Sequence, residues 1–226
     1  MTPRSDSAPD RFTLELIKGA LNAARAEMEA LVARTAMSPF IREKKDYFTA
    51  FLNPKGELVV STSLTLAGNL VDAILDEYPA QTMRAGDLYW YNDCYGTRGA
   101  VSHLPDMAFV MPVFHEGRLI AFAEAWGHLW DVGGSVPGSI SPFATSVFQE
   151  GIMIPPVRVM REGVENEEVV EAFVERRRDF VVDDAAGQVP DGARTMTSGP
   201  CFLALPHRHD TDGFFAARMR RLPAAA

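Results

Sequence analysis

Two long apolar runs separated by a short polar turn constrain the fold of this chain more than any other feature. The runs are Met107–Phe114 and Leu119–His128, and the turn between them reads HEGR, residues 115–118. Apolar and aromatic runs on both sides of a glycine-containing turn are typical of a β-hairpin. We therefore expect an antiparallel pair of strands at the centre of the fold.

The two ends of such a hairpin have to meet. A ladder centred on the turn places Asp106 opposite Gly127 or His128, with His103 just beyond it. Asp131 follows His128 at the spacing that separates His103 from Asp106. The hairpin thus brings two His-x-x-Asp pairs together at one end of a rigid element.

Imidazole nitrogen and carboxylate oxygen are ligands that suit Mn, Fe or Zn. These residues also have a simpler interpretation, because an Asp before a strand commonly forms a turn and a His at a strand end is commonly structural. The convergence of several such groups favours a divalent metal site over this structural alternative.

Several residues near this end are candidates for substrate contact. Asp131 precedes Gly133 and Gly134, whose backbone can approach a ligand closely or can simply form a loop with positive φ. Asn92 and Asp93 follow the short aromatic strand expected at Leu88–Tyr91, where they either orient the site or form an Asx turn. We take these five residues as the predicted substrate-binding set.

The rest of the chain predicts an α+β fold of antiparallel hairpins packed with helices. Thr13 can cap a first helix that ends at Ser38-Pro39, and a second helix is expected over Ala67–Arg84. The remaining expected elements are strands at Tyr47–Leu52 and Leu58–Ser61, an extended edge segment over Ile152–Met160, and a helix over Glu165–Arg178.

The overall composition excludes some classes of function. The chain has 226 residues, 47% of them apolar and 23% charged, with a formal net charge of −8. Such a chain has no general attraction to nucleic acid or to an anionic membrane. Its two cysteines follow no metal or redox spacing, and no stretch resembles a signal peptide or a membrane span, so we expect a cytoplasmic protein. Residues 1–12 are expected to be a disordered tail.

Four motifs, in order, resemble the hydantoinase B/oxoprolinase family, which includes the corresponding subunits of acetone and acetophenone carboxylases. They are YNDCYGTRGAVSHLPD, MPVFHEGRLIAF, GHLWDVGGSVPGS and FQEGIMIPPVRV. The resemblance covers about residues 13–161 and has two departures, since the family usually shows proline where Cys94 stands and a shorter glycine loop before the histidine. Because the family domain is much longer, the chain is expected to hold a truncated form of it.

The resemblance implies a site and partners. His103, Asp106 and His128 match the family's metal-binding positions, and Glu43 is implied as a fourth ligand. A hydantoinase A-type subunit would bind ATP in a hetero-oligomer, which agrees with the lack of a Gly-x-x-x-x-Gly-Lys loop in this sequence. The implied substrate is a small molecule: a hydantoin, 5-oxoproline or a ketone.

The tail from about residue 162 has a different character. The segments ENEEVVEAFVERRRDF and LPHRHDTDGFFAARMRR resemble the C-terminal end of Sun/NOL1-type ribosomal RNA cytosine methyltransferases, but that family's nucleophilic cysteine and methyl-donor motif are missing. Residues 162–226 are therefore expected to be a small appendage. The alternatives to a hydrolase or carboxylase subunit are a non-catalytic truncated or fused product and a methyltransferase-related fragment.

Overall fold

The computed structural model describes residues 9–62, 69–166, 180–198, 201–204, 214–216 and 219–222. The chain divides into two compact units, residues 1–165 and 166–226. Most of the expected tail, residues 1–8, and most of the helix expected over Glu165–Arg178 lie outside the described residues. Among the described helices, none combines the length and the apolar character needed to cross a membrane.

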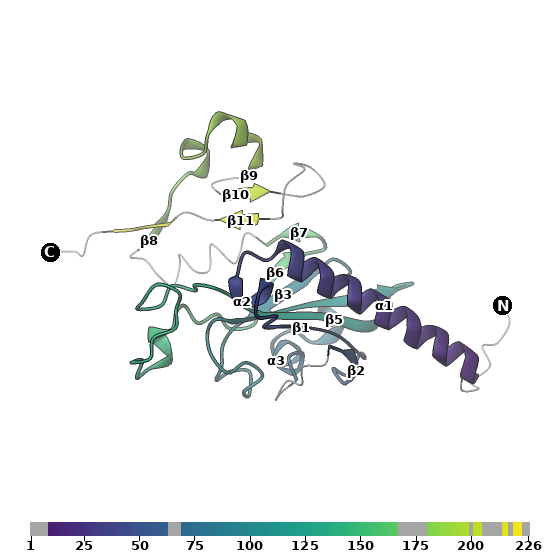
Figure 1. The fold of residues 1–226 in the computed structure, drawn as a ribbon. Helices are drawn as coiled ribbons and strands as arrows, with labels where there is room; N and C mark the ends of the chain where they lie inside the picture. Colours follow the sequence, from purple (N-terminus) through teal and green to yellow (C-terminus); the bar gives the residue numbers. More distant parts are fainter. Residues whose placement is uncertain are drawn as a thin grey trace. The chain divides into compact units, whose positions relative to one another are not determined.

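The described part of the first unit is built on a seven-stranded antiparallel sheet with the order β2-β1-β5-β4-β3-β6-β7 (Figure 1). The expected α+β class of antiparallel hairpins packed with helices is confirmed. Its strands are β1 (Tyr47–Leu52), β2 (Leu58–Ser61), β3 (Leu88–Tyr91), β4 (Asp106–His115), β5 (Arg118–His128), β6 (Val157–Arg161) and β7 (Val164–Glu165).

The predicted hairpin is β4 and β5 at the centre of this sheet. Its turn is shorter than expected, because His115 pairs with Arg118 and leaves only Glu116 and Gly117 between the strands. Their φ angles of 48° and 75° are both positive, as a type I′ turn requires. A register shift at Val113/Phe114 then sets Asp106 opposite His128. The register expected at the hairpin's open end is therefore confirmed.

The long helix α1 (Arg11–Thr35) begins earlier than expected. Asp10 is its N-cap, because a carboxylate oxygen of Asp10 accepts a hydrogen bond from Thr13 N at 3.0 Å. The prediction that Thr13 caps the helix is therefore wrong. α1 lies against β1 and β2, yet none of its residues is buried, and Phe12 and Leu16 are well exposed.

The second predicted helix is much shorter in the structure. Instead of spanning Ala67–Arg84, it forms α3 (Asp72–Glu77), followed by the 3-10 helix η1 (Ala80–Thr82). Asn69 accepts a hydrogen bond from Val71 N in a turn just before α3. At the other end, Pro79 disfavours a helical conformation for the residue before it. Local turn chemistry at both ends thus overrides the apolar periodicity.

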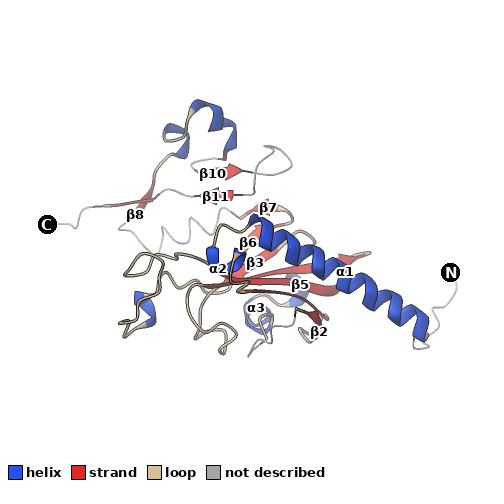
Figure 2. Ribbon diagram, in the orientation of Figure 1, coloured by secondary structure: helices blue, strands red, loops and turns tan. Residues whose placement is uncertain are grey.

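The core of this unit lies between one face of the sheet and α3. Figure 1 shows α1 and α3 on opposite sides of the sheet, and Figure 2 shows the same layers coloured by type. The largest buried apolar side chains of this core are Phe48, Leu70, Ile74, Tyr89, Tyr91, Phe122 and Trp126.

One carboxyl group lies on this buried face. Glu124 of β5 is 2% exposed and stands between Ala50 of β1 and Val110 of β4 in the strand register. Burial raises the pKa of its carboxyl to about 8, so Glu124 is largely protonated at neutral pH.

The segment after β5 leads through the 3-10 helix η2 (Val147–Gln149) to β6. β6 pairs with β3, and the two-residue strand β7 pairs only with Met160 and Arg161, so the expected edge position holds for residues 157–159 but not for the end of β6. At that end the edge is β7. Asp87 anchors this corner, because its buried carboxylate accepts hydrogen bonds from Tyr89 Oη and from Glu162 N.

The described residues of the second unit form short strands and 3-10 helices. They are β8 (Phe180–Val182), η3 (Ala185–Gly187), η4 (Asp191–Met196), β9 (Thr197–Ser198), β10 (Cys201–Ala204), β11 (Phe214–Ala216) and β12 (Met219–Arg221). The strands pair in the orders β11-β10-β9 and β12-β8.

Candidate metal centre

Three side chains meet at the open end of the β4–β5 hairpin. Asp106 begins β4, His128 ends β5, and His103 lies in the loop just before β4. His128 Nδ1 is 3.2 Å from Asp106 Oδ1, and His103 Nε2 is 3.5 Å from Asp106 Oδ2. One ligand atom from each of the three residues lies within 4.8 Å of the other two.

The segment between α1 and β1 holds His128 in place. Ser38 Oγ donates a hydrogen bond to the carbonyl oxygen of His128 at 2.6 Å, and His128 N donates to Asp46 O at 3.1 Å. The ring of Phe40, in the short helix α2 (Pro39–Arg42), packs on the imidazole with 4.4 Å between ring centroids. The His128 imidazole is therefore fixed from both its backbone and its ring face.

Gly127 allows this close approach. A Cβ atom at Gly127 would stand 2.7 Å from Ile41 Cδ1 of α2. The absence of a side chain at Gly127 lets α2 pack against β5. This packing is what brings the segment before β1 to the site.

Three buried polar atoms of the cluster have no hydrogen-bond partner among the described residues, although one of them, Asp106 Oδ1, faces His128 Nδ1 at 3.2 Å. Within the described part of the chain, Asp106 Oδ1, His128 Nε2 and His103 Nδ1 are buried and have no hydrogen-bond partner. Buried polar atoms are usually paired, and an unpaired set of nitrogen and oxygen donors suits a divalent cation such as Mn, Fe or Zn. The donor set present therefore fits a metal ion.

A fourth side chain with a ligand atom lies nearby, but it is not the predicted Glu43. Asp46 Oδ2 is 3.7 Å from His128 Nδ1, because β1 pairs with β5 and Tyr47 stands opposite Gly127. Glu43 is exposed at the end of α2 and is not a member of the cluster of three. A role for Glu43 as a ligand stays a prediction, while Asp46 has the better position.

Asn92 is fully occupied as a structural clamp. Its side-chain amide donates to Leu104 O at 2.8 Å and to Ile152 O at 2.9 Å, and its Oδ1 accepts from Ile154 N at 2.6 Å. Both amide hydrogens are used and the residue is 0% exposed. Asn92 thus ties the loop that carries His103 to the segment before β6.

Asp93 and Asp131 both accept hydrogen bonds from their own loops. Asp93 Oδ1 accepts from the N–H groups of residues 95 and 96, which is the Asx turn considered above. Asp131 accepts from Gly133 N, Gly138 N and Ser139 Oγ, and these bonds, with that of Gly138 first, lower the pKa of its carboxyl. Direct substrate contact by Asp93 or Asp131 stays a prediction.

The two glycines of the predicted set differ from each other. Gly133 has a φ of 83°, which favours glycine, and has only Ile152 near its open side. Gly134 is needed for packing within its loop, because an added Cβ would stand 2.7 Å from Glu150 O. A role in substrate binding is untested for both.

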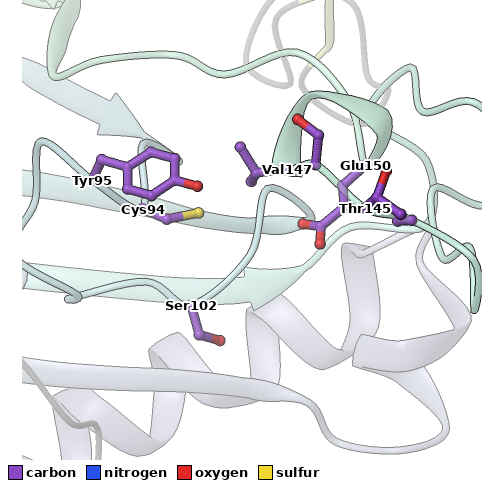
Figure 3. A pocket seen from close by; sticks show the side chains of 8 residues that line it. Cys94, Tyr95, Ser102, Thr145, Val147 and Glu150 are labelled. Atoms are coloured by element: carbon purple, nitrogen blue, oxygen red, sulfur yellow. The ribbon is translucent and has the colours of Figure 1, made fainter.

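A pocket of about 350 Å³ lies beside the cluster (Figure 3). Its lining residues are Cys94, Tyr95, Ser102, Ala144, Thr145, Ser146, Val147 and Glu150. Ser102 links the pocket to the cluster, since Ser102 Oγ is 3.5 Å from Asp106 Oδ2. Glu150 does so from the other side by accepting a hydrogen bond from Leu104 N.

The pocket contains two groups that sequence reasoning did not select, Glu150 and Ser102. In the sequence, the FQEG motif pointed to Glu150, and the position next to His103 pointed to Ser102. Cys94 also lines the pocket, and burial, together with the charge of Glu150, raises the pKa of its thiol. Cys94 is therefore a neutral thiol rather than a nucleophilic thiolate.

Known proteins share the sequence pattern and the fold of this chain. The Hydantoinase B/oxoprolinase family model matches residues 10–193. The 5-oxoprolinase of Dictyostelium discoideum is 30% identical over 68% of this chain and 12% of its own length. Caprolactamase subunit beta of Pseudomonas jessenii is 29% identical over 75% of this chain and 29% of its own length. The crystal structure of the ATP-dependent caprolactamase from the same species matches 74% of this chain and 29% of that chain, with a TM-score of 0.63 and 28% identity.

The chain belongs to the hydantoinase B/oxoprolinase family. It spans less than a third of the length of the relatives named above. The family match also continues past Arg161, where the motif resemblance ended, and enters the second unit. These comparisons give no support to the resemblance of the tail to Sun/NOL1-type methyltransferases.

Proposed function

We propose that this chain is a hydantoinase B-type subunit of an ATP-dependent hydrolase that opens a cyclic amide, with a divalent metal ion held by His103, Asp106 and His128. The observation that carries the proposal is the convergence of these three side chains within 4.8 Å, with unpaired nitrogen and oxygen atoms. When bound there, the ion would polarise a carbonyl-derived oxygen or lower the pKa of a bound water.

His103 is the most exposed of the three residues of the cluster. The side chains of Asp106 and His128 are 4% and 7% exposed, whereas that of His103 is 39% exposed. A catalytic metal site keeps a position for water or substrate, while a structural site is closed by protein ligands. A substrate therefore reaches the cluster from the side of His103. The buried side chains of Asp106 and His128 form the inner part of the site.

ATP would be handled by a second subunit. The sequence has no Gly-x-x-x-x-Gly-Lys phosphate loop, and a similar chain is described as subunit beta of a caprolactamase. We infer that a hydantoinase A-type partner binds ATP and activates the amide, and that the two chains form a hetero-oligomer. The present chain supplies the metal cluster and the adjoining pocket.

Reconstitution tests this proposal. The chain is combined with a hydantoinase A-type subunit co-purified from the native host, and ATP-dependent opening of a hydantoin or lactam ring is followed. Activity should need both subunits, and the present chain alone should show no ATP-dependent turnover. ATP-dependent carboxylation of a ketone without any ring opening would replace the hydrolase by the carboxylase alternative. Turnover that survives His128→Ala unchanged would contradict the role of the cluster.

A further inference from the structure

Among the described residues that line the pocket beside the cluster, one is acidic and none is basic. Of its eight lining residues, Glu150 is the only ionised one at neutral pH, and the others offer hydroxyl, thiol and methyl groups. Figure 3 shows the carboxylate of Glu150 and the thiol of Cys94 turned toward each other across the pocket in this view. The carboxylate of a charged ligand would therefore be repelled by the carboxylate of Glu150, and no cation in the described lining would offset this repulsion.

Four backbone N–H groups around the pocket already have acceptors within the chain. Exposed N–H groups in a loop can bind an anion, but those of residues 95 and 96 already donate to Asp93 at 2.8 and 2.9 Å. The N–H groups of residues 145 and 146 likewise donate to Gln149 Oε1 at 2.7 and 3.3 Å. Side chains of the protein therefore already accept hydrogen bonds from these four N–H groups, which could otherwise bind an anion.

Neighbouring charges do not reverse this balance. The guanidinium of Arg98, from the same loop as Cys94, is paired with Asp76. The carboxylates of Asp106 and Asp46 would offset the charge of a divalent ion in the cluster. The carboxylate of Glu150 has no cationic partner among the described residues that line the pocket.

We propose that this pocket selects an uncharged cyclic amide, such as a hydantoin or a simple lactam, and disfavours 5-oxoproline, whose ring carries a carboxylate. The carboxylate of Glu150 accepts the ring N–H, and a hydroxyl group such as that of Ser146 donates to a ring carbonyl. This inference deepens the proposed function and rests on it, because the contact of Ser102 with Asp106 joins the pocket to the cluster.

The matched probes are 2-pyrrolidinone and 5-oxoproline, which share one lactam ring and differ by the carboxylate. Dissociation constants for the full chain are measured by ligand-observed NMR, with the divalent ion present. We expect 5-oxoproline to bind about tenfold more weakly or worse, given the strength of a like-charge contact at short range. Equal or tighter binding of 5-oxoproline, or no binding of 2-pyrrolidinone, would overturn the inference.

Glu150→Gln identifies the source of the selectivity. The glutamine keeps an oxygen that can accept from Leu104 N, so the loop should stay in place. The difference in affinity between the two probes should shrink severalfold in this variant. The control is Glu116→Gln, which removes the same charge from the exposed hairpin turn and should leave the difference unchanged. An undiminished difference in Glu150→Gln would contradict the role of Glu150.

The metal content of the same samples separates this inference from the proposed function. Suppose that the native chain and Glu150→Gln both retain the ion and that each binds 2-pyrrolidinone and 5-oxoproline equally well. The inferred substrate class is then wrong, and the metal centre stands. If the native chain prefers 2-pyrrolidinone and Glu150→Gln abolishes the preference while no sample retains metal, the pocket is supported and the proposed metal centre fails.

Discussion

Two buried acids in this chain have opposite surroundings. Asp106 lies between two imidazoles at the hairpin end, whereas Glu124 lies on the apolar face of β5. Within the described residues, Glu124 Oε1 has no hydrogen-bond partner. An isolated carboxyl in an apolar core is stable only in its neutral form. We therefore expect Asp106 to bind a metal ion and Glu124 to make the stability of the fold depend on pH.

Glu124 should make the fold less stable as the pH rises. Its carboxyl has a pKa of about 8 in the folded chain and an ordinary, lower value in the unfolded chain. The contribution of Glu124 to stability is complete at pH values below its pKa in the unfolded chain. It is lost as the pH rises through its pKa in the folded chain. Between these values the free energy of unfolding falls by up to about 1.4 kcal/mol per pH unit. Glu124→Gln should flatten this slope in urea unfolding at pH 5 to 8.

The exposed carboxylate of Glu116 provides the control for this measurement. Glu116→Gln removes a charge from the hairpin turn and should keep the slope of the native chain. A Glu124→Gln variant with the native slope would show that Glu124 does not titrate in this range.

At the scale of single elements, short-range patterns were predictable and long-range pairings were not. The hairpin register followed from its own turn, and the turn of strands β1 and β2 was similarly local. The approach of Asp46 to His128 depends on the pairing of β1 with β5, which no local pattern encodes. The burial of Glu124 depends on the same pairing.

The structural role of Asn92 was also hidden from the sequence. Its hydrogen-bond partners lie up to 62 residues away along the chain, and they exist only after β3 has been joined to the segment before β6. An Asx turn and a substrate contact could both be predicted from Asn92-Asp93, but a buried clamp could not. The turn residue proved to be its neighbour Asp93.

Asn92→Ala should destabilise the first unit markedly. Three hydrogen bonds would be lost and the buried partners left unsatisfied, at about 1–3 kcal/mol for each unsatisfied group, and these costs are not fully additive. Chemical denaturation should show a loss of at least about 2 kcal/mol. The matched control is Asn53→Ala, in the exposed turn after β1, which should cost about 1 kcal/mol or less. Equal costs for the two variants would contradict the clamp.

At the scale of the whole molecule, the metal cluster, the pocket and the seven-stranded sheet all lie within residues 1–165. The family match extends into the second unit, to residue 193. The predicted boundary at residue 162 stays a prediction, since the family match ends at residue 193 and the compact units divide after residue 165. The first unit contains every contact on which the proposed site depends.

We expect a fragment of residues 1–165 to fold by itself. It should unfold cooperatively in urea with a midpoint close to that of the first unit in the full chain, because the core around Phe122 and Ile74 lies within it. Circular dichroism and thermal melting of both chains test this. A fragment without a cooperative transition would show that residues 166–226 are needed to complete the fold.

The most direct test of the central claim is the metal content of the purified full chain and its variants, measured by mass spectrometry after saturation and desalting. The native chain should retain about one divalent ion, whereas His128→Ala should retain none, since it loses a ligand from a small set. His115→Ala, in the exposed hairpin turn, should retain the native amount. Both variants should stay folded by circular dichroism. Native metal content in folded His128→Ala, or no retained metal in the native chain, would contradict the metal centre.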